Sequence, residues 1–87
     1  MNYQYILFEQ QGAIATLTFN RPDKHNSFNL EMIWEITEAT REVGEDSSVR
    51  VLVLKGAGKS FSSGADLDDY VAHTPASVLK SNRRWIE

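Results

Sequence analysis

The sequence contains no cysteine, which excludes a disulfide framework and any metal site built on thiolates. No apolar run approaches the roughly 20 residues that a membrane-spanning helix needs. The amino-terminal residues MNYQY contain no basic residue leading into an apolar stretch, so we expect no secretory signal. These absences favour a cytoplasmic protein with no membrane partner.

Basic residues are also few. Nine lysines and arginines stand against twelve aspartates and glutamates, for a net charge of -3, which disfavours a nucleic-acid partner. The hydrophobic fraction of 41% and the charged fraction of 24% are ordinary for a globular protein. A length of 87 residues allows one small domain, spanning residues 1–87.

The distribution of apolar and turn residues predicts an α/β fold. Residues 5–9 and 13–19 have the character of two strands joined by a turn at residues 10–12. Asn29 is a good N-cap for a helix over residues 30–43, and Gly44 favours its end. Residues 49–55 are predicted to form a third strand, and Thr74 and Pro75 to begin a last helix that follows a short one near Asp66.

Two patterns refine this fold. Along the first helix, Met32, Ile36, Ala39 and Val43 form one apolar stripe, with a row of glutamates on the neighbouring, solvated face. Residues 51–54 read VLVL, a continuous apolar run typical of a strand covered on both faces. Because this strand follows a helix, a parallel crossover is expected.

A loop rich in small residues follows the third strand. Residues 56–66 read GAGKSFSSGAD and leave the carboxyl end of the strand, where open α/β sheets bind ligands. Two interpretations fit: a binding loop in which a ligand approaches bare backbone, or a glycine-rich turn that only links two elements. The glycine spacing fits neither a P-loop nor a dinucleotide-binding motif.

A second segment, residues 20–29, reads NRPDKHNSFN between a strand and the capped helix. Lys24 has the charge to contact a phosphate and His25 has the chemistry of an acid or base. Isolated loop residues of these types are more often simply solvated.

Together these two segments resemble the crotonase (enoyl-CoA hydratase/isomerase) superfamily over about residues 5–70. Residues 20–29 match the family pattern N-R-P-x-K-x-N-[AS]-x-[ND]. Residues 56–67 match G-x-G-x-x-F-[CSA]-[AS]-G-[AG]-D-[LI]. The two patterns occur in the family's order, at its spacing, with one amphipathic helix between them.

The resemblance implies an acyl-CoA thioester as substrate and the amino-terminal portion of a ββα-repeat spiral. It places the Ala65 backbone N–H in an oxyanion hole that stabilises an enolate. It further implies contacts to coenzyme A, mostly through the main chain, from Lys24, His25, Ser27, Ser63, Gly64, Ala65, Asp66 and Leu67. Coenzyme A is then part of the substrate, and no separate cofactor or metal is expected.

Family members are about three times longer, and their catalytic acids and second oxyanion donor lie in later segments. No glutamate here matches a family acid or base, and the last helix reaches Glu87 without a stop signal, so we expect a chain truncated at its carboxyl side. The parent reaction implied is hydration of a 2-enoyl-CoA, in a homotrimer or hexamer. Two alternatives stay open: a non-catalytic acyl-CoA-binding or subunit-assembly module, and an unrelated small α/β domain.

Overall fold

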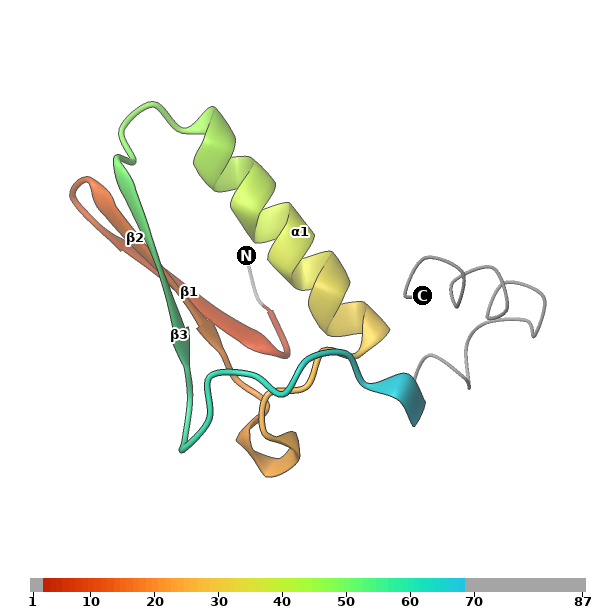
Figure 1. Cartoon of the computed structure of the whole chain (residues 1–87). Helices are drawn as coiled ribbons and strands as arrows, with labels where there is room; N and C mark the ends of the chain where they lie inside the picture. The colour runs from red at the N-terminus through yellow and green to blue at the C-terminus, as the bar shows by residue number, and fades with distance from the viewer. Residues whose placement is uncertain (1–2, 69–87) are drawn as a thin grey trace, which may run out of the picture.

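The computed structural model describes residues 3–68. Within them the order is two strands, a short 3-10 helix, a long α-helix and a third strand (Figure 1). Their bounds are β1 Ile6–Gln11, β2 Ile14–Phe19, η1 Pro22–Lys24, α1 Leu30–Glu45 and β3 Val51–Gly56. The predicted order of hairpin, helix and strand is confirmed, and the helix predicted from Thr74 lies outside the described residues.

The three strands form one sheet in the order β1-β2-β3. β1 and β2 are antiparallel, with Ile6 opposite Phe19, and Gly12 makes the tight turn between them at a φ of 59°. β2 and β3 are parallel, with Phe19 opposite Gly56, as the crossover through α1 predicted. The carboxyl ends of β2 and β3 therefore lie at the same edge of the sheet.

α1 begins as the sequence predicted and ends later. The Asn29 side chain accepts a hydrogen bond from the Met32 N–H at 2.8 Å, which is the N-cap geometry. The prediction that Gly44 ends the helix was wrong, because α1 continues to Glu45 and Asp46 forms the C-cap. Gly44 does not adopt a positive φ, so it lies within the helix.

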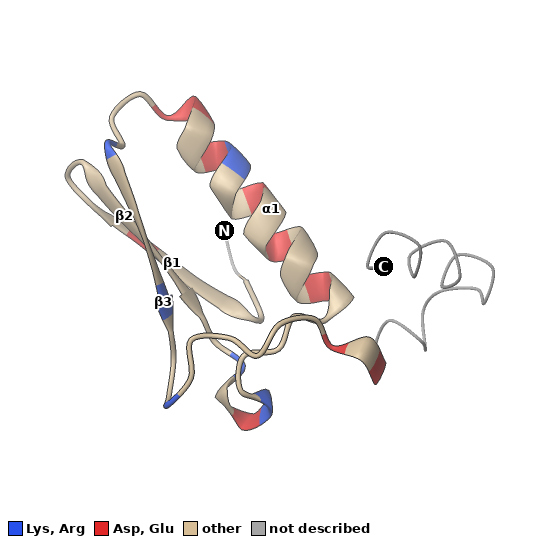
Figure 2. Ribbon diagram, viewed as in Figure 1, with Lys and Arg blue, Asp and Glu red and all other residues tan. Residues whose placement is uncertain are grey.

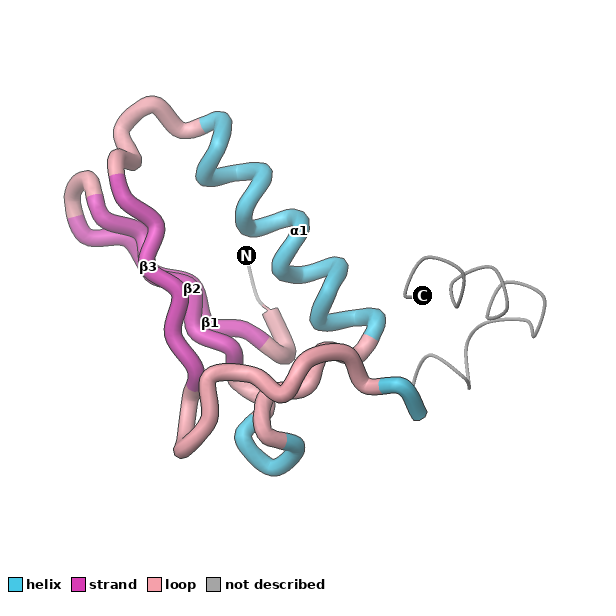
Figure 3. Tube along the Cα trace, viewed as in Figure 1, coloured by secondary structure: helices cyan, strands magenta, loops and turns pink. Residues whose placement is uncertain are grey.

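The core lies between α1 and one face of the sheet (Figure 3). Met32 and Ala39 from the predicted stripe are buried there, against inward side chains of the first two strands. The fully or nearly buried apolar side chains are Ile6, Ala15, Leu17, Phe19, Met32 and Ala39.

The prediction that β3 is covered on both faces was wrong for the described residues. Val51 and Val53 are 50% and 38% exposed on the outer face of the sheet, and Leu54 is 47% exposed although it shares the inner face. β3 is an edge strand, whereas α1 packs chiefly over β1. No described element covers the outer face.

One member of the glutamate row does more than face solvent. Glu35 is half-buried, and its carboxylate accepts hydrogen bonds from the N–H groups of Gln4 and Tyr5, each at 2.8 Å. The start of the chain is thereby tied to α1 just before β1 begins. Among residues 3–68, no helix has the length and apolar character needed to cross a membrane.

Candidate functional site

Two loops meet at the carboxyl ends of β2 and β3. Residues 20–29 leave β2 and residues 56–66 leave β3, and Figure 3 shows them side by side below the sheet and α1. Parallel neighbouring strands end at the same edge, so the segments that leave them are brought together although α1 and β3 lie between them in the sequence.

Asn26 joins the two loops from the inside. It is fully buried, and its side-chain oxygen accepts a hydrogen bond from the Arg21 N–H at 2.8 Å. Its side-chain nitrogen donates to the carbonyls of Ala57 and Ser60, at 2.9 and 2.8 Å. Asn26 has a φ of 56°, and asparagine is one of the few residues that adopt this left-handed conformation readily. This one side chain therefore sets the spacing of both loops.

A short run of main-chain bonds continues the junction. Ser63 donates to the His25 carbonyl at 3.1 Å. Phe28 then donates to the Gly64 carbonyl at 2.7 Å and accepts from the Asp66 N–H at 2.9 Å, which makes a parallel bridge between Phe28 and Ala65. The loop after β3 is thus held along the segment that leads into α1, with Gly64 at a φ of 99°.

This bridge determines the direction of the Ala65 N–H. The C=O and the N–H of one trans peptide unit point in opposite directions, and the peptide between Gly64 and Ala65 is trans. Because the Gly64 carbonyl and the Asp66 N–H both face Phe28, the Ala65 N–H points away from it. Ser63, Gly64 and Asp66 all donate to protein acceptors, whereas the Ala65 N–H has none within residues 3–68. Ala65 is an exposed residue, and within residues 3–68 no protein group accepts a hydrogen bond from its N–H.

An ion pair lies directly beside that donor. The Arg21 guanidinium donates through Nη1 to Asp66 Oδ2 at 2.8 Å. The same nitrogen donates to the carbonyl and to the hydroxyl oxygen of Ser27, both at 3.0 Å. The Arg21 and Asp66 side chains are only 16% and 18% exposed, so the pair is largely shielded from water.

Bare backbone is required where the loop after β3 turns. A Cβ added to Gly56 would lie 2.3 Å from the Ser60 carbonyl oxygen and 2.6 Å from Phe61 Cα, both backbone atoms. The Phe61 ring packs edge-on against the Phe19 ring, with 5.1 Å between the ring centroids. The Phe28 ring also packs edge-on against the Phe19 ring, at 5.0 Å between centroids. The small residues of residues 56–66 therefore let the chain fold back against the end of β2.

The remaining residues singled out from the sequence lie on these loops. Lys24 ends η1 and is exposed, and His25 follows it at a φ of 53° with Nδ1 3.4 Å from the Ser60 hydroxyl. Ser63 is exposed and Leu67 is 66% exposed. Figure 2 shows basic and acidic residues together at this end of the molecule, and mostly acidic residues along α1.

The structure adds residues that sequence reasoning passed over. Asn26 was quoted only as part of a motif, and the Arg21–Asp66 pair joins residues 45 positions apart. Asn26 had one signal, because asparagine in a loop is among the few residues that readily adopt a positive φ. The Arg21–Asp66 pair had none, because opposite charges far apart in sequence do not show that they pair.

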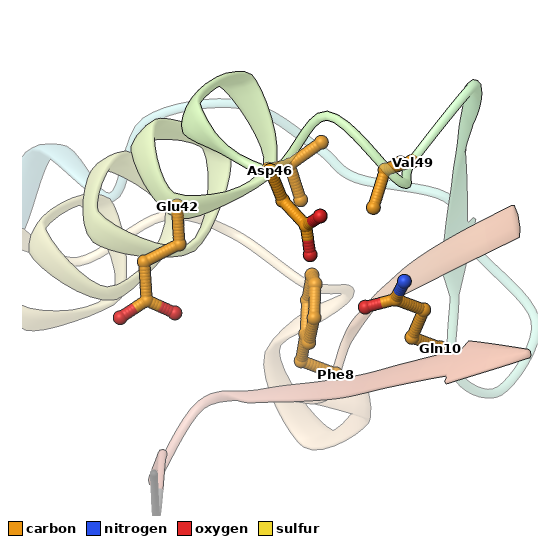
Figure 4. Close-up of a pocket in the computed structure, with 6 residues that line it drawn as sticks. Phe8, Gln10, Glu42, Asp46 and Val49 are labelled. Atoms are coloured by element: carbon orange, nitrogen blue, oxygen red, sulfur yellow. The ribbon is translucent and has the colours of Figure 1, made fainter. Parts of the chain in front are cut away.

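Elsewhere in residues 3–68, the structure shows a further hollow. A shallow hollow lies at the other end of α1, away from the two loops (Figure 4). It is lined by Phe8, Gln10, Glu42, Val43, Asp46 and Val49. Among residues 3–68, no three side chains of histidine, aspartate or glutamate come together as a metal site.

The fold and the paired loops define a class of protein. Residues 9–84 match the model of the enoyl-CoA hydratase/isomerase family, and the chain belongs to that family. This confirms the family resemblance that the two motifs indicated.

Individual relatives that match most of this chain have different named activities. The chain is 42% identical over 66 residues to a 1,2-epoxyphenylacetyl-CoA isomerase of Escherichia coli, covering 76% of this chain and 25% of the relative. It is 39% identical over 80 residues to the 4-chlorobenzoyl coenzyme A dehalogenase-2 of an Arthrobacter species, covering 92% of this chain and 29% of the relative.

Solved structures agree with the fold. An enoyl-CoA hydratase/isomerase from Mycobacterium paratuberculosis superposes with a TM-score of 0.72 at 38% identity, over 78% of this chain and 29% of that one. One from Xanthobacter autotrophicus gives 0.76 at 37% identity, over 82% and 26%. The predicted crotonase-type α/β fold is therefore confirmed, and the chain spans about a quarter to a third of the length of these relatives.

Proposed function

We propose that this chain binds an acyl-CoA thioester and holds its carbonyl oxygen with the Ala65 N–H. The observation that carries the proposal is the open Ala65 donor beside a junction in which the neighbouring N–H groups all have protein acceptors. A donor that is fixed in direction and has no acceptor within residues 3–68 suits an oxygen on which negative charge develops. When a base removes a proton from the carbon next to a thioester carbonyl, the electron pair of that C–H bond moves toward the carbonyl oxygen and gives such an enolate oxygen. Addition of a nucleophile to the β-carbon of a 2-enoyl thioester does the same with the electron pair of the C=C bond.

The same loops supply the proposed contacts to coenzyme A. Lys24 is exposed at the end of η1, in reach of a phosphate that binds across the loops. The backbone around His25 and Ser27, and from Ser63 through Leu67, contacts the pantetheine and adenine portions in this proposal. Coenzyme A is then a portion of the substrate and no separate cofactor takes part.

The parent reaction we propose is hydration of a 2-enoyl-CoA. The relatives named above are an isomerase and a dehalogenase, and each matches most of this chain. Thioester binding is the part of these reactions that one shared segment can serve. The choice of reaction then depends on groups other than those described.

A non-catalytic acyl-CoA-binding module is the second candidate. It is favoured by the state of Asp66, the carboxylate adjacent to Ala65 in sequence, which is engaged by Arg21 rather than directed at a substrate. Under this alternative the thioester binds at Ala65 without proton transfer.

Calorimetry with a chemically synthesised chain tests whether the Ala65 N–H binds the thioester carbonyl. Replacing alanine 65 by lactate turns one amide into an ester, which removes the Ala65 N–H and leaves the methyl group. We expect the 87-residue chain to bind 2-butenoyl-CoA. The ester should weaken the affinity for 2-butenoyl-CoA about ten-fold more than it weakens the affinity for coenzyme A. A difference of about ten-fold corresponds to the loss of one hydrogen bond to a charged or polarised group. An ester chain that binds the thioester as well as the all-amide chain would contradict the role of Ala65. Turnover of 2-butenoyl-CoA would favour the hydratase over the binding module.

A further inference from the structure

The Ala65 donor is useful only if its direction is fixed, and the residue after it is held from two sides. The Asp66 N–H is bonded to the Phe28 carbonyl at 2.9 Å. The Asp66 carboxylate is bonded to Arg21 at 2.8 Å. We propose that Arg21 and Asp66 are a positioning pair that braces the Phe28–Ala65 bridge and so keeps the Ala65 N–H oriented toward the thioester carbonyl, an inference that rests on the proposed function.

The contacts of Arg21 make it a brace between the loops. Its Nη1 reaches Asp66 on one loop and both the carbonyl and the hydroxyl of Ser27 on the other. Ser27 directly precedes Phe28, the residue that bridges to Ala65. The guanidinium therefore closes a ring of contacts around the bridge, and a charge-assisted hydrogen bond opposes displacement of Asp66 from Phe28.

Burial strengthens this brace relative to a surface ion pair. With 16% and 18% of their side chains exposed, Arg21 and Asp66 are shielded from much of the screening that weakens exposed pairs. A partner left alone in such a place is an uncompensated, partly desolvated charge. Removing either group is thus expected to shift the Asp66 backbone, and with it the Ala65 N–H.

Arginine and lysine differ at this position. The guanidinium is planar and presents its donors in a fixed fork, whereas the lysine ammonium is a point charge on a flexible stem. Arg21→Lys keeps the positive charge but loses this fixed direction. Arg21→Gln loses both.

The test uses a thioester whose absorption reports on its carbonyl. A 3-arylacryloyl-CoA absorbs at longer wavelength when a donor polarises the thioester oxygen, so the red shift of the fully bound ligand measures the alignment of the Ala65 N–H. Calorimetry with the same thioester and with coenzyme A gives the two affinities. A purely structural role would change the fraction of folded chain but not the red shift per bound ligand.

We expect the wild-type chain to give a red shift, Arg21→Gln to give the smallest one, and Arg21→Lys to give an intermediate one. Thioester affinity relative to coenzyme A should fall about ten-fold in Arg21→Gln, as for one charge-assisted hydrogen bond. Asp66→Asn, which keeps the shape of the side chain, should also reduce the shift, and it decides the question if Arg21→Gln does not fold. The matched control is Arg41→Gln, which breaks an exposed pair with Glu38 at 3.6 Å on α1 and should keep the wild-type shift.

Wild-type red shifts in the folded Arg21 and Asp66 variants would overturn the positioning role and leave the proposed function intact. A wild-type chain that binds the thioester with no red shift, or does not bind it, would overturn the proposed function itself, and the positioning role with it.

Discussion

The junction of the two loops and the layer between α1 and the sheet are held together by different forces. At the junction, buried polar groups join backbone to backbone, with Asn26 completely enclosed and Arg21 and Asp66 paired. In the layer, apolar side chains such as Leu17 and Met32 meet on one face of the sheet, while the other face stays exposed.

The two kinds of contact differ in how precisely they fix the orientation of backbone groups. Apolar packing tolerates small shifts because it has no preferred direction, whereas hydrogen bonds require defined donors and acceptors. A backbone N–H that must point at a substrate therefore needs hydrogen bonds to fix its direction. The comparison predicts that changes at the junction are costly even where no apolar core is lost.

The largest expected effect is at Asn26. Asn26→Ala leaves the Arg21 N–H and the carbonyls of Ala57 and Ser60 without their partner, and places alanine at a φ of 56°. We expect a loss of about 3 kcal/mol in the free energy of unfolding, measured with urea.

Gln10 gives the control for this change, because its exposed side chain bonds Gly12 and Ser48 at the other end of the sheet. Gln10→Ala should change the free energy of unfolding by no more than about 0.5 kcal/mol. Equal effects at Asn26 and Gln10 would remove the distinction between the regions.

A glycine-to-alanine substitution should have opposite effects at the loop junction and in α1. Gly56→Ala forces a Cβ to within 2.3 Å of the Ser60 carbonyl oxygen, so we expect a loss of about 2 kcal/mol. Gly44→Ala, in α1 with nothing within 4 Å of the added Cβ, should stabilise the chain by about 0.5–1 kcal/mol. Urea unfolding of the two variants gives the signs, and a neutral Gly56→Ala would show that the loop can relax.

A smaller effect is expected on the outer face of the sheet. Val53 is 38% exposed there, and Val53→Thr keeps both its shape and its β-branching. The free energy of unfolding should change by no more than about 0.5 kcal/mol. A loss several times larger would mean that this face is covered in solution.

The smallest effect concerns Asp46, after α1. Hydrogen bonds from the Ser48 hydroxyl and N–H lower the pKa of the Asp46 carboxyl below its ordinary value. The ionised form is thus favoured in the folded chain, so its contribution is present above the unfolded pKa and is lost as the pH falls through the folded one. Ser48→Ala should raise the Asp46 pKa, as followed by carbon NMR of the carboxyl group; an unchanged titration would show that the hydroxyl bond is absent.

Local patterns foretold much of the fold. The Asn29 cap and the apolar stripe through Met32 gave the start and the buried face of α1, because capping and amphipathic spacing depend on neighbouring residues. The exposure of Val51 and Val53 was not foretold, because an apolar run does not reveal which elements lie beside it.

In the candidate site too, local patterns predicted some features, and contacts between distant segments determined the others. The motif residues 56–66 located Ala65 at the edge of the sheet, but the direction of its N–H depends on the bridge to Phe28, a contact between distant segments. The buried position of Asn26 likewise depends on carbonyls more than 30 residues away. Such pairings arise only when the crossover brings the loops together.

The most direct test of the account is the behaviour of the Ala65 amide in nitrogen–proton NMR spectra. In the free chain this N–H, which has no acceptor within residues 3–68, should exchange with solvent faster than those of Ser63 and Asp66. Adding 2-butenoyl-CoA should shift the Ala65 amide proton downfield and slow its exchange, while coenzyme A alone should do neither. An Ala65 signal that stays unchanged when the thioester binds would contradict the central claim that this donor holds the thioester carbonyl.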